Sequence, residues 1–533
     1  MAHEEKDVRP TGKSYETMKK ILKSRFVTTA HVLFGRDVDE LTEAEIYKTV
    51  AATAKQSISD NWIKTNRQYA QKRVKQIYYF SIEFLLGRLL RANLINLGLE
   101  EAMKEVLQEF DLKLSDAYEE EPEDPSLYSS ILLAQNAQTV DEEELFRAHL
   151  GYARLFDRVP RYTDHAPHAH EKIRVGYISP DFRRNVLQHF VQPLLMGYDR
   201  ARFEVYAYST AETPDEVTAA LRPHVTVWRD LGGAAPEEIA ARIHCDEIDI
   251  LVDLAGHAAG GALPVLAYRP APVQMMGLGY TATSGLPAVD FFLTDAVCDP
   301  VGGVSETYFT EKLIRLPSQF VYVPRADLPI STGAPAKRRG HILFGVFNQY
   351  RKFTDAMLLC WREILERVPQ AQLLLKSQIF FAPAMMEAAQ TRLKRLGFDL
   401  ARVILEPATT DYMERYLDVD IALDTYPWPG GGTTCDALYM GVPVVTLYGT
   451  RRSTRFSYAL LTHVGLANLA AETSADYVLR AASLAEDMDA LDLLHRELRM
   501  RMERSAIMDQ EGYMRALERA YEDVLHTHKG ERA

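Results

Sequence analysis

This sequence of 533 residues has few cysteines, no long apolar run and no cluster of basic residues. The four cysteines, at positions 245, 298, 360 and 435, lack CxxC spacing, so we expect neither disulfides nor a zinc site, and a cytoplasmic location. No apolar run approaches the ~20 residues of a membrane helix, so no membrane partner is expected. Lys and Arg number 61 against 74 Asp and Glu. Without a basic block, nucleic acid is not expected as a partner either.

Repeats and targeting signals are also missing. The first ten residues are charged and have no apolar centre, which predicts no secretory signal. No 34-residue self-similarity of the tetratricopeptide type is found. The length instead predicts two to four domains.

The first third of the chain has the pattern of helices. Apolar residues recur at helical spacing over residues 14–115, and residues 127–165 show the same pattern. The acidic, proline-containing residues 116–126 separate these two helical stretches. We therefore predict a helical N-terminal extension over residues 1–122 and a helical connector over residues 123–172.

From residue 173 onward, short apolar runs alternate with helical segments, as in a parallel sheet covered by helices. Residues 326–340 are rich in Pro, Gly and basic residues and interrupt this series as a linker. The alternation predicts two Rossmann-like domains, residues 173–330 and 331–533, with a ligand site in the cleft between them. Residues 474–525 are predicted to be helical and to pack back across the domains.

The richest segment runs from Leu423 to Gly449, LDTYPWPGGGTTCDALYMGVPVVTLYG. It has the pattern of a buried strand, a turn, a helix start and a second buried strand. Gly431, Gly432, Thr433 and Thr434 open the helix, where free N–H groups and hydroxyls suit a phosphate. Asp436, two residues later, could accept from ribose hydroxyls. The alternative is an ordinary turn whose small residues allow close packing.

A second candidate is FGVFNQYRKF, residues 344–353, which is a strand followed by a polar turn. Ligand-binding groups of a parallel sheet lie at such strand ends. Lys352 is the best candidate for a cation that stabilises a diphosphate, and Arg351 adds charge. The alternative is a solvated basic helix start.

Both segments resemble the SPINDLY-type protein O-GlcNAc transferases, and the resemblance extends from Pro125 to the C-terminus. It implies a GT-B fold, in which two Rossmann-like domains face a cleft. It also implies metal-independent transfer of N-acetylglucosamine or a related sugar from a UDP-sugar to Ser or Thr of a protein or peptide acceptor. No cofactor or metal is then needed, because positive side chains and helix N-termini stabilise the leaving diphosphate.

The resemblance assigns roles to further residues. Asn348 and Gln349 match positions that contact the nucleotide, and Lys352 matches the lysine that contacts the diphosphate. Lys376 ends an apolar run where the family often has a basic residue facing the nucleotide. Arg455 matches a family arginine after the last strand, although a structural ion pair is an equal alternative.

The catalytic base is less clear from the sequence. In the segment Val175 to Leu195, Asn185 occupies the position of the family's proposed catalytic histidine. His189 lies four residues later, about one helical turn away on the same face, and could take that role. Asn185 can still donate to a phosphate oxygen. His257, in a Gly/Ala-rich loop after a buried strand, is a further candidate for contact with diphosphate or acceptor.

Three departures from the family pattern leave alternatives open. Asn185 replaces a histidine, Gly432 stands where a threonine is usual, and Tyr412 stands where a histidine is common. One alternative keeps the fold with another donor, such as GDP-fucose, or with Asn as acceptor. The other, which the three departures favour, is a catalytically weakened nucleotide-sugar-binding or scaffold protein.

A different resemblance covers residues 14–122. The run IYYFSIEFLLGRLLRANLINLG, Ile77 to Gly98, is similar to the N-terminal region of glycogen phosphorylases. The glycine-rich loop and the lysine segment for pyridoxal phosphate do not follow, so phosphorylase activity is not inferred. We expect a helical appendage that serves docking or homo-oligomerisation.

Overall fold

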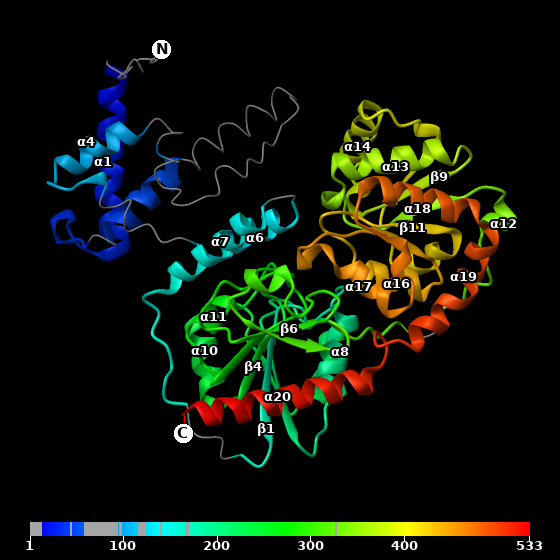
Figure 1. The fold of residues 1–533 in the computed structure, drawn as a ribbon. Helices are drawn as coiled ribbons and strands as arrows, with labels where there is room; N and C mark the ends of the chain where they lie inside the picture. The colour runs from blue at the N-terminus through cyan, green and yellow to red at the C-terminus, as the bar shows by residue number, and fades with distance from the viewer. Residues whose placement is uncertain are drawn as a thin grey trace. The chain divides into compact units, whose positions relative to one another are not determined.

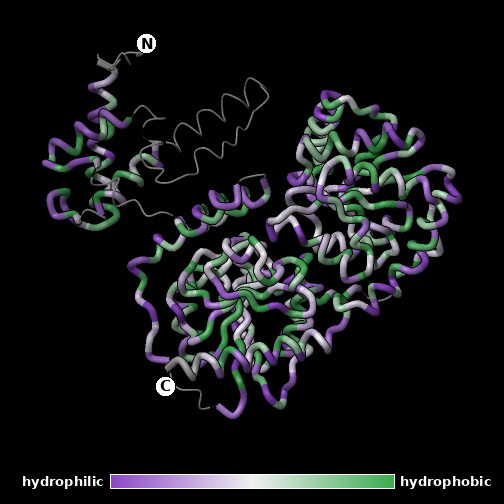
Figure 2. Tube along the Cα trace, in the orientation of Figure 1, coloured by the Kyte–Doolittle hydropathy of each residue, from purple (hydrophilic) through white to green (hydrophobic). Residues whose placement is uncertain are grey.

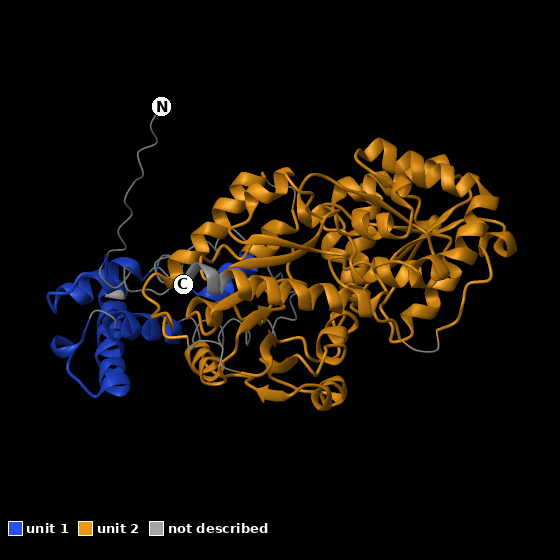
Figure 3. Cartoon of the chain, turned by 60° about the horizontal axis from the view of Figure 1, so that its bottom comes forward, with its two compact units in different colours: residues 1–131 blue, residues 132–533 orange. Residues whose placement is uncertain are grey.

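The computed structural model describes residues 13–42, 45–57, 94, 99–115, 124–138, 141–165, 170–325 and 328–532. The chain forms two compact units, residues 1–131 and 132–533, shown in blue and orange in Figure 3. Apart from Leu94, the run from Ile77 to Gly98 lies outside the described residues. The phosphorylase resemblance of that run therefore stays a prediction.

The described part of the first unit is helical, as predicted. Its elements are α1 (Lys13–Phe34), a helix over residues 45–57 and α4 (Glu100–Gln108). Phe26, Val50 and Val106 are fully buried in the core that these helices share. Amphipathic helices of this length gain most of their stability from such packing.

The second unit contains two parallel sheets (Figure 1). Their strand orders are β3-β2-β1-β4-β5-β6-β7 and β10-β9-β8-β11-β12-β13, and every pair of neighbours is parallel. The strands of the first sheet are β1 (Ile173–Ser179), β2 (Phe203–Ser209), β3 (Val227–Asp230), β4 (Ile250–Asp253), β5 (Val273–Met276), β6 (Phe291–Asp295) and β7 (Lys312–Leu316). Those of the second are β8 (Leu343–Val346), β9 (Gln372–Lys376), β10 (Val403–Glu406), β11 (Ile421–Leu423), β12 (Val444–Leu447) and β13 (Ala470–Ala471).

Helices cover both sheets and precede the first of them. The N-terminal helices of this part are α6 (Pro125–Asn136) and α7 (Glu142–Tyr152), followed by α8 (Gln188–Met196), α9 (Glu216–Leu221), α10 (Pro236–Cys245) and α11 (Leu263–Ala267). Around the second sheet lie α12 (Ala336–Arg339), α13 (Asp355–Arg367), α14 (Pro383–Arg395), α15 (Tyr412–Arg415), α16 (Gly432–Tyr439), α17 (Phe456–His463), α18 (Ser474–Glu486) and α19 (Met488–Glu503). Every residue of the central strands β4, β8 and β12 is buried. Figure 2 shows hydrophobic residues gathered in the strands, as expected when both faces of a parallel sheet are covered.

The C-terminal helix α20 (Gln510–Arg532) returns to the first sheet and crosses it (Figure 1). Leu517 and Tyr521 are buried in the core of that sheet. The Tyr521 hydroxyl lies 3.1 Å from the Tyr177 hydroxyl on β1, and Glu518 accepts from the Asp199 N–H at 2.7 Å. The last helix thus packs on the first sheet, although it follows the second sheet in the chain.

The connection between the sheets is anchored rather than loose. Asp420 accepts from the Ala336 N–H at 2.6 Å and also pairs with Arg339. Asp492 on α19 accepts from the Ala334 N–H at 2.9 Å. The segment predicted as a linker is therefore held against the second sheet.

Candidate functional site

A buried aspartate organises the carboxyl ends of the strands in the second sheet. Asp424 follows β11, and its Oδ1 accepts from the Gly430 N–H at 2.8 Å and from Asn348 Nδ2 at 3.2 Å. Its Oδ2 accepts from the Thr446 hydroxyl at 2.8 Å. One carboxylate thus joins the end of β8, the glycine-rich turn and β12. Sequence analysis missed this residue, although an aspartate directly after a buried strand was the available signal.

The N-terminus of α16 is open in the way that the glycine-rich turn predicts. The first helical hydrogen bond runs from the Cys435 N–H to the Gly431 carbonyl at 3.0 Å. The N–H groups of Gly432, Thr433 and Thr434 precede it and have no acceptor within the helix. Together with the helix dipole, these groups favour an anion at this end.

Two threonine hydroxyls attach this helix start to its surroundings. The Thr433 hydroxyl donates to Asn348 Oδ1 at 3.1 Å, so it joins α16 to the end of β8. The buried Thr434 hydroxyl lies 2.8 Å from the Ser457 hydroxyl on α17. The structure therefore brings Asn348 and Thr433 together, whereas Thr434 is directed into the protein.

Lys352 lies beside the same turn. Its Nζ donates to the Pro429 carbonyl at 3.0 Å and sits 4.7 Å from the centre of the Trp428 ring. Burial lowers the pKa of Lys352 to about 8. Arg351 also lies over Trp428, at 4.9 Å, and donates to the Gln349 side chain at 2.7 Å. Gln349 is exposed, so of the two amides predicted to contact nucleotide only Asn348 is built into the site.

Asp436 is a buried polar residue of the site and is 2% exposed. One carboxylate oxygen accepts from the Tyr322 hydroxyl at 2.7 Å and the other from the Tyr412 hydroxyl at 2.8 Å. Burial raises the pKa of Asp436, and the two tyrosine hydroxyls oppose that rise. Tyr322 belongs to the segment after the first sheet. The carboxylate predicted to bind ribose therefore also ties the two halves together.

His189 reaches the same region from the first domain. Its Nδ1 lies 2.7 Å from the Val323 carbonyl, which can only accept, so Nδ1 carries the proton of the neutral ring. Nε2 then keeps a lone pair, and the Gln188 amide lies 3.2 Å from it. His189 also lies near enough to Asp436 that its protonated form would lower the pKa of that carboxyl. This arrangement suits a proton acceptor.

Asn185 is engaged locally. Its Nδ2 donates to Asp181 Oδ1 at 2.6 Å, and its Oδ1 accepts from the Leu187 N–H at 2.8 Å. Both ends of the amide thus shape the turn that precedes α8.

His257 is enclosed in the first domain and is 1% exposed. Its Nε2 lies 2.9 Å from the Ser284 carbonyl, and the rings of His149, Tyr152 and Tyr280 surround it. Burial and the neighbouring His149 hold the pKa of His257 well below its ordinary value. The structure does not bring this histidine to the start of α16.

Lys376 and Arg455 are engaged by protein groups. The buried Lys376 donates to the Pro407 carbonyl at 2.9 Å and so anchors the loop after β10. Arg455 donates from Nε to the Val297 carbonyl and from Nη1 to the Gly449 carbonyl, both at 3.1 Å. These contacts are hydrogen bonds to one carbonyl of each domain and differ from the structural ion pair that was the alternative for Arg455.

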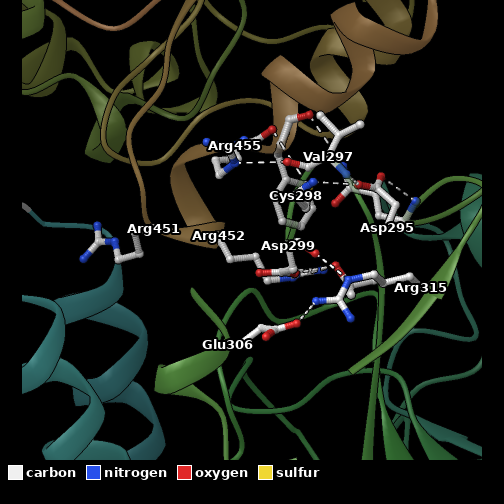
Figure 4. Close-up of polar contacts among 12 residues, drawn as sticks. Asp295, Val297, Cys298, Asp299, Glu306, Arg315, Arg451, Arg452 and Arg455 are labelled. Carbon is white, nitrogen blue, oxygen red and sulfur yellow. Dashed lines mark hydrogen bonds and ion pairs between the residues drawn. The ribbon is translucent and has the colours of Figure 1, made fainter. Parts of the chain in front are cut away.

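Next to Arg455, a buried ion pair joins the two sheets (Figure 4). Arg452, 4% exposed, donates to Asp299 Oδ2 at 2.9 Å, and the Asp299 side chain is fully buried. The guanidinium lies 4.6 Å from the Phe292 ring and 5.0 Å from the Phe456 ring. Nothing in the local sequence of either partner pointed to this pair.

The start of α16 also meets the first domain at Val186. A Cβ added to Gly432 would lie 2.3 Å from Val186 Cγ2. Any side chain at position 432 therefore requires Val186 to move. This contact gives a physical reason for glycine at the position where threonine is usual.

The described helices include none that is both long and apolar enough to span a membrane. The sequence profile of glycosyl transferase family 41 matches residues 153–327 and 334–517. Among solved structures, a substitution mutant of the O-GlcNAc transferase from Thermobaculum terrenum superimposes with a TM-score of 0.74 at 26% identity. The match covers 98% of this chain and 100% of that one.

Curated relatives are longer than this chain. It is 36% identical over 420 residues to a probable UDP-N-acetylglucosamine–peptide N-acetylglucosaminyltransferase SPINDLY from Hordeum vulgare, which covers 76% of this chain. It is 37% identical over 402 residues to the SPINDLY protein of Arabidopsis thaliana, which covers 73% of this chain. The match spans 44% of each relative, less than half of its length.

Proposed function

Because the chain belongs to glycosyl transferase family 41, we propose that it transfers N-acetylglucosamine or a related sugar from a UDP-sugar to Ser or Thr of a protein acceptor. One observation carries the proposal. Lys352 donates to the Pro429 carbonyl, two residues before the turn that opens α16. A cation and a helix N-terminus thus meet at one point, which is the arrangement that a leaving diphosphate requires.

In this proposal the diphosphate is held without a metal ion. Lys352 and the N–H groups at the start of α16 face the charge that grows on the leaving group as the glycosidic bond breaks. The Thr433 hydroxyl, which Asn348 orients, contributes a further contact. Fixed donors of this kind do not have to reorganise during the reaction, so they stabilise the transition state more than the bound substrate.

His189 is the proposed base that takes the proton of the acceptor hydroxyl. Its Nδ1–H is fixed on the Val323 carbonyl, which leaves Nε2 as the acceptor. The enclosed His257 is a weaker candidate, because its Nε2 is bound within the first domain. We assign His257 to the packing of that domain.

A second candidate function is nucleotide-sugar binding with little turnover. It is favoured by Asn185, whose amide is engaged by Asp181 and Leu187 and cannot accept a proton. Tyr412 favours it too, because it stands where a histidine is common in the family and its hydroxyl is engaged by Asp436. These alternatives differ in measurable ways.

Calorimetric titration of the full chain with UDP, GDP, UDP-N-acetylglucosamine and GDP-fucose tests the donor. We expect the UDP compounds to bind most tightly. A preference for the GDP compounds would mean that the donor is a GDP-sugar. UDP release with a Ser/Thr-rich peptide, compared with its Ala-substituted control, tests turnover. If UDP is released equally with both peptides, or with neither, the proposed transfer to Ser or Thr is refuted. Loss of release in His189→Ala but not in His257→Gln is expected from the assigned base.

A further inference from the structure

Trp428 contacts two cations with one ring. The Lys352 ammonium lies 4.7 Å and the Arg351 guanidinium 4.9 Å from the centre of its indole. Indole is the most favourable side chain for such contacts. The ring belongs to the turn between β11 and α16, so it holds both cations beside the open helix start.

The partners of Lys352 leave its charge uncompensated. Among the residues that the structure describes, no carboxylate lies within ion-pair distance of its Nζ; the Pro429 carbonyl and the Trp428 ring hold it. Asp424 acts on Lys352 only through its more distant charge, and Arg351 opposes it. A carboxylate in contact would hold the ammonium equally well but would cancel the field that an anionic ligand needs.

The backbone of the turn that carries the ring is held by two hydrogen bonds. The Thr425 hydroxyl donates to the Trp428 carbonyl at 2.6 Å. The Gly430 N–H donates to the buried Asp424. These two bonds hold the backbone on either side of Pro429, whose carbonyl accepts from Lys352.

We propose that Trp428 is a positioning residue, whose indole holds the Lys352 ammonium at the N-terminus of α16 and leaves its charge available to the diphosphate of a nucleotide donor. This inference rests on the proposed function for the identity of the anion. The placement of Lys352 by Trp428 does not depend on the donor and can be measured separately.

The first test uses the ligand-free chain. Trace acetylation with acetic anhydride at several pH values, followed by peptide mass spectrometry, gives the pKa of Lys352. The ring stabilises the charged form, so Trp428→Leu should lower that pKa below its value in the unsubstituted chain. Trp428→Phe keeps an aromatic face and should restore most of the difference. An equal pKa in the unsubstituted chain and in Trp428→Leu would overturn the proposal.

The second test is UDP binding measured by calorimetry from pH 6.5 to pH 9.5. In the unsubstituted chain the affinity should fall as Lys352 loses its proton near pH 8. Trp428→Leu should weaken binding about 3- to 30-fold at neutral pH and move the fall to lower pH. In a Lys352→Met background, Trp428→Leu should change the affinity less than 2-fold. A full effect of Trp428 without Lys352 would mean that the ring acts on its own and would also overturn the proposal.

The two tests separate two failures. If the pKa of Lys352 depends on Trp428 but neither UDP nor GDP binds, Trp428 still positions Lys352 and the proposed function is refuted. Tight UDP binding with no response of either property to Trp428→Leu would remove the placement alone.

Discussion

Replacing Arg452 with Met tests how strongly the two Rossmann-like domains are joined. Arg452 donates to the fully buried Asp299 at 2.9 Å. Met keeps a long apolar side chain against the Phe292 and Phe456 rings, so the substitution removes mainly the positive charge. Among the residues that the structure describes, the Thr294 hydroxyl would then be the remaining side-chain donor to the buried Asp299 carboxylate.

Removing one partner of a buried ion pair costs about 3–5 kcal/mol, because the remaining charge has lost both water and its counter-ion. With a free energy of unfolding that falls by about 2–3 kcal/mol per molar urea, this loss lowers the unfolding midpoint by about 1–2.5 M. The double substitution Arg452→Met with Asp299→Asn removes both charges. It should recover about half or more of the loss.

The assay is urea unfolding of the full chain, followed by far-UV circular dichroism. Arg367→Met is the matched control, because Arg367 and Glu363 form an exposed pair on α13 with 50% and 46% exposed side chains. Such a pair contributes about 0.5 kcal/mol or less, and its loss should barely move the midpoint. If Arg452→Met shifts the midpoint no more than Arg367→Met does, the buried ion pair does not stabilise the chain as described. A double substitution less stable than Arg452→Met alone would also show that the unpaired Asp299 charge is not the source of the loss.

Gly432→Thr should weaken UDP binding and lower the free energy of unfolding by about 1–3 kcal/mol, because its Cβ would lie 2.3 Å from Val186 Cγ2. Adding Val186→Ala should restore both the affinity and the stability. If calorimetry and urea unfolding show no rescue, the contact with Val186 is not the cause. Lys352→Ala should weaken UDP binding by about 2–3 kcal/mol, because a charge-assisted contact in the site is lost; unchanged affinity by calorimetry would exclude Lys352 from diphosphate binding. Burial lowers the pKa of His149 and of His495 to about 4, below the ~6.5 of an unfolded histidine. The unfolded chain thus binds more protons between these values, and stability should fall as pH drops from 6.5 to 4, by up to about 3 kcal/mol for each histidine. His495→Gln should make the urea midpoint less dependent on pH in that window, and an unchanged dependence would contradict this account.

The alternation of apolar runs and helical segments was enough to predict two parallel α/β domains, and the two sheets confirm it. Gly431–Thr434 and Lys352 could be placed near one another for a simple reason. The carboxyl ends of parallel strands share one edge of a sheet, so the segments after β8 and β11, which pair directly, had to lie side by side. Local chemistry and strand direction are properties of the sequence pattern.

Such local patterns could not predict the contacts between the two domains. Arg452 meets Asp299, which lies 153 positions earlier in the sequence, and Val186 covers Gly432 from the other domain. The same holds for Asp436, which accepts from Tyr322 of the segment after the first sheet.

His189 and His257 show the difference most clearly. Each lies on or after an apolar element of the first domain, and the sequence offered both as candidates. The structure turns His189 toward Val323 and Asp436, and encloses His257 among aromatic rings. The sequence by itself determined the two sheets and the polar turns at their strand ends, because these follow from local periodicity. The tertiary structure alone decided which side chains meet across the domains, because that depends on how two separately folded surfaces pack together.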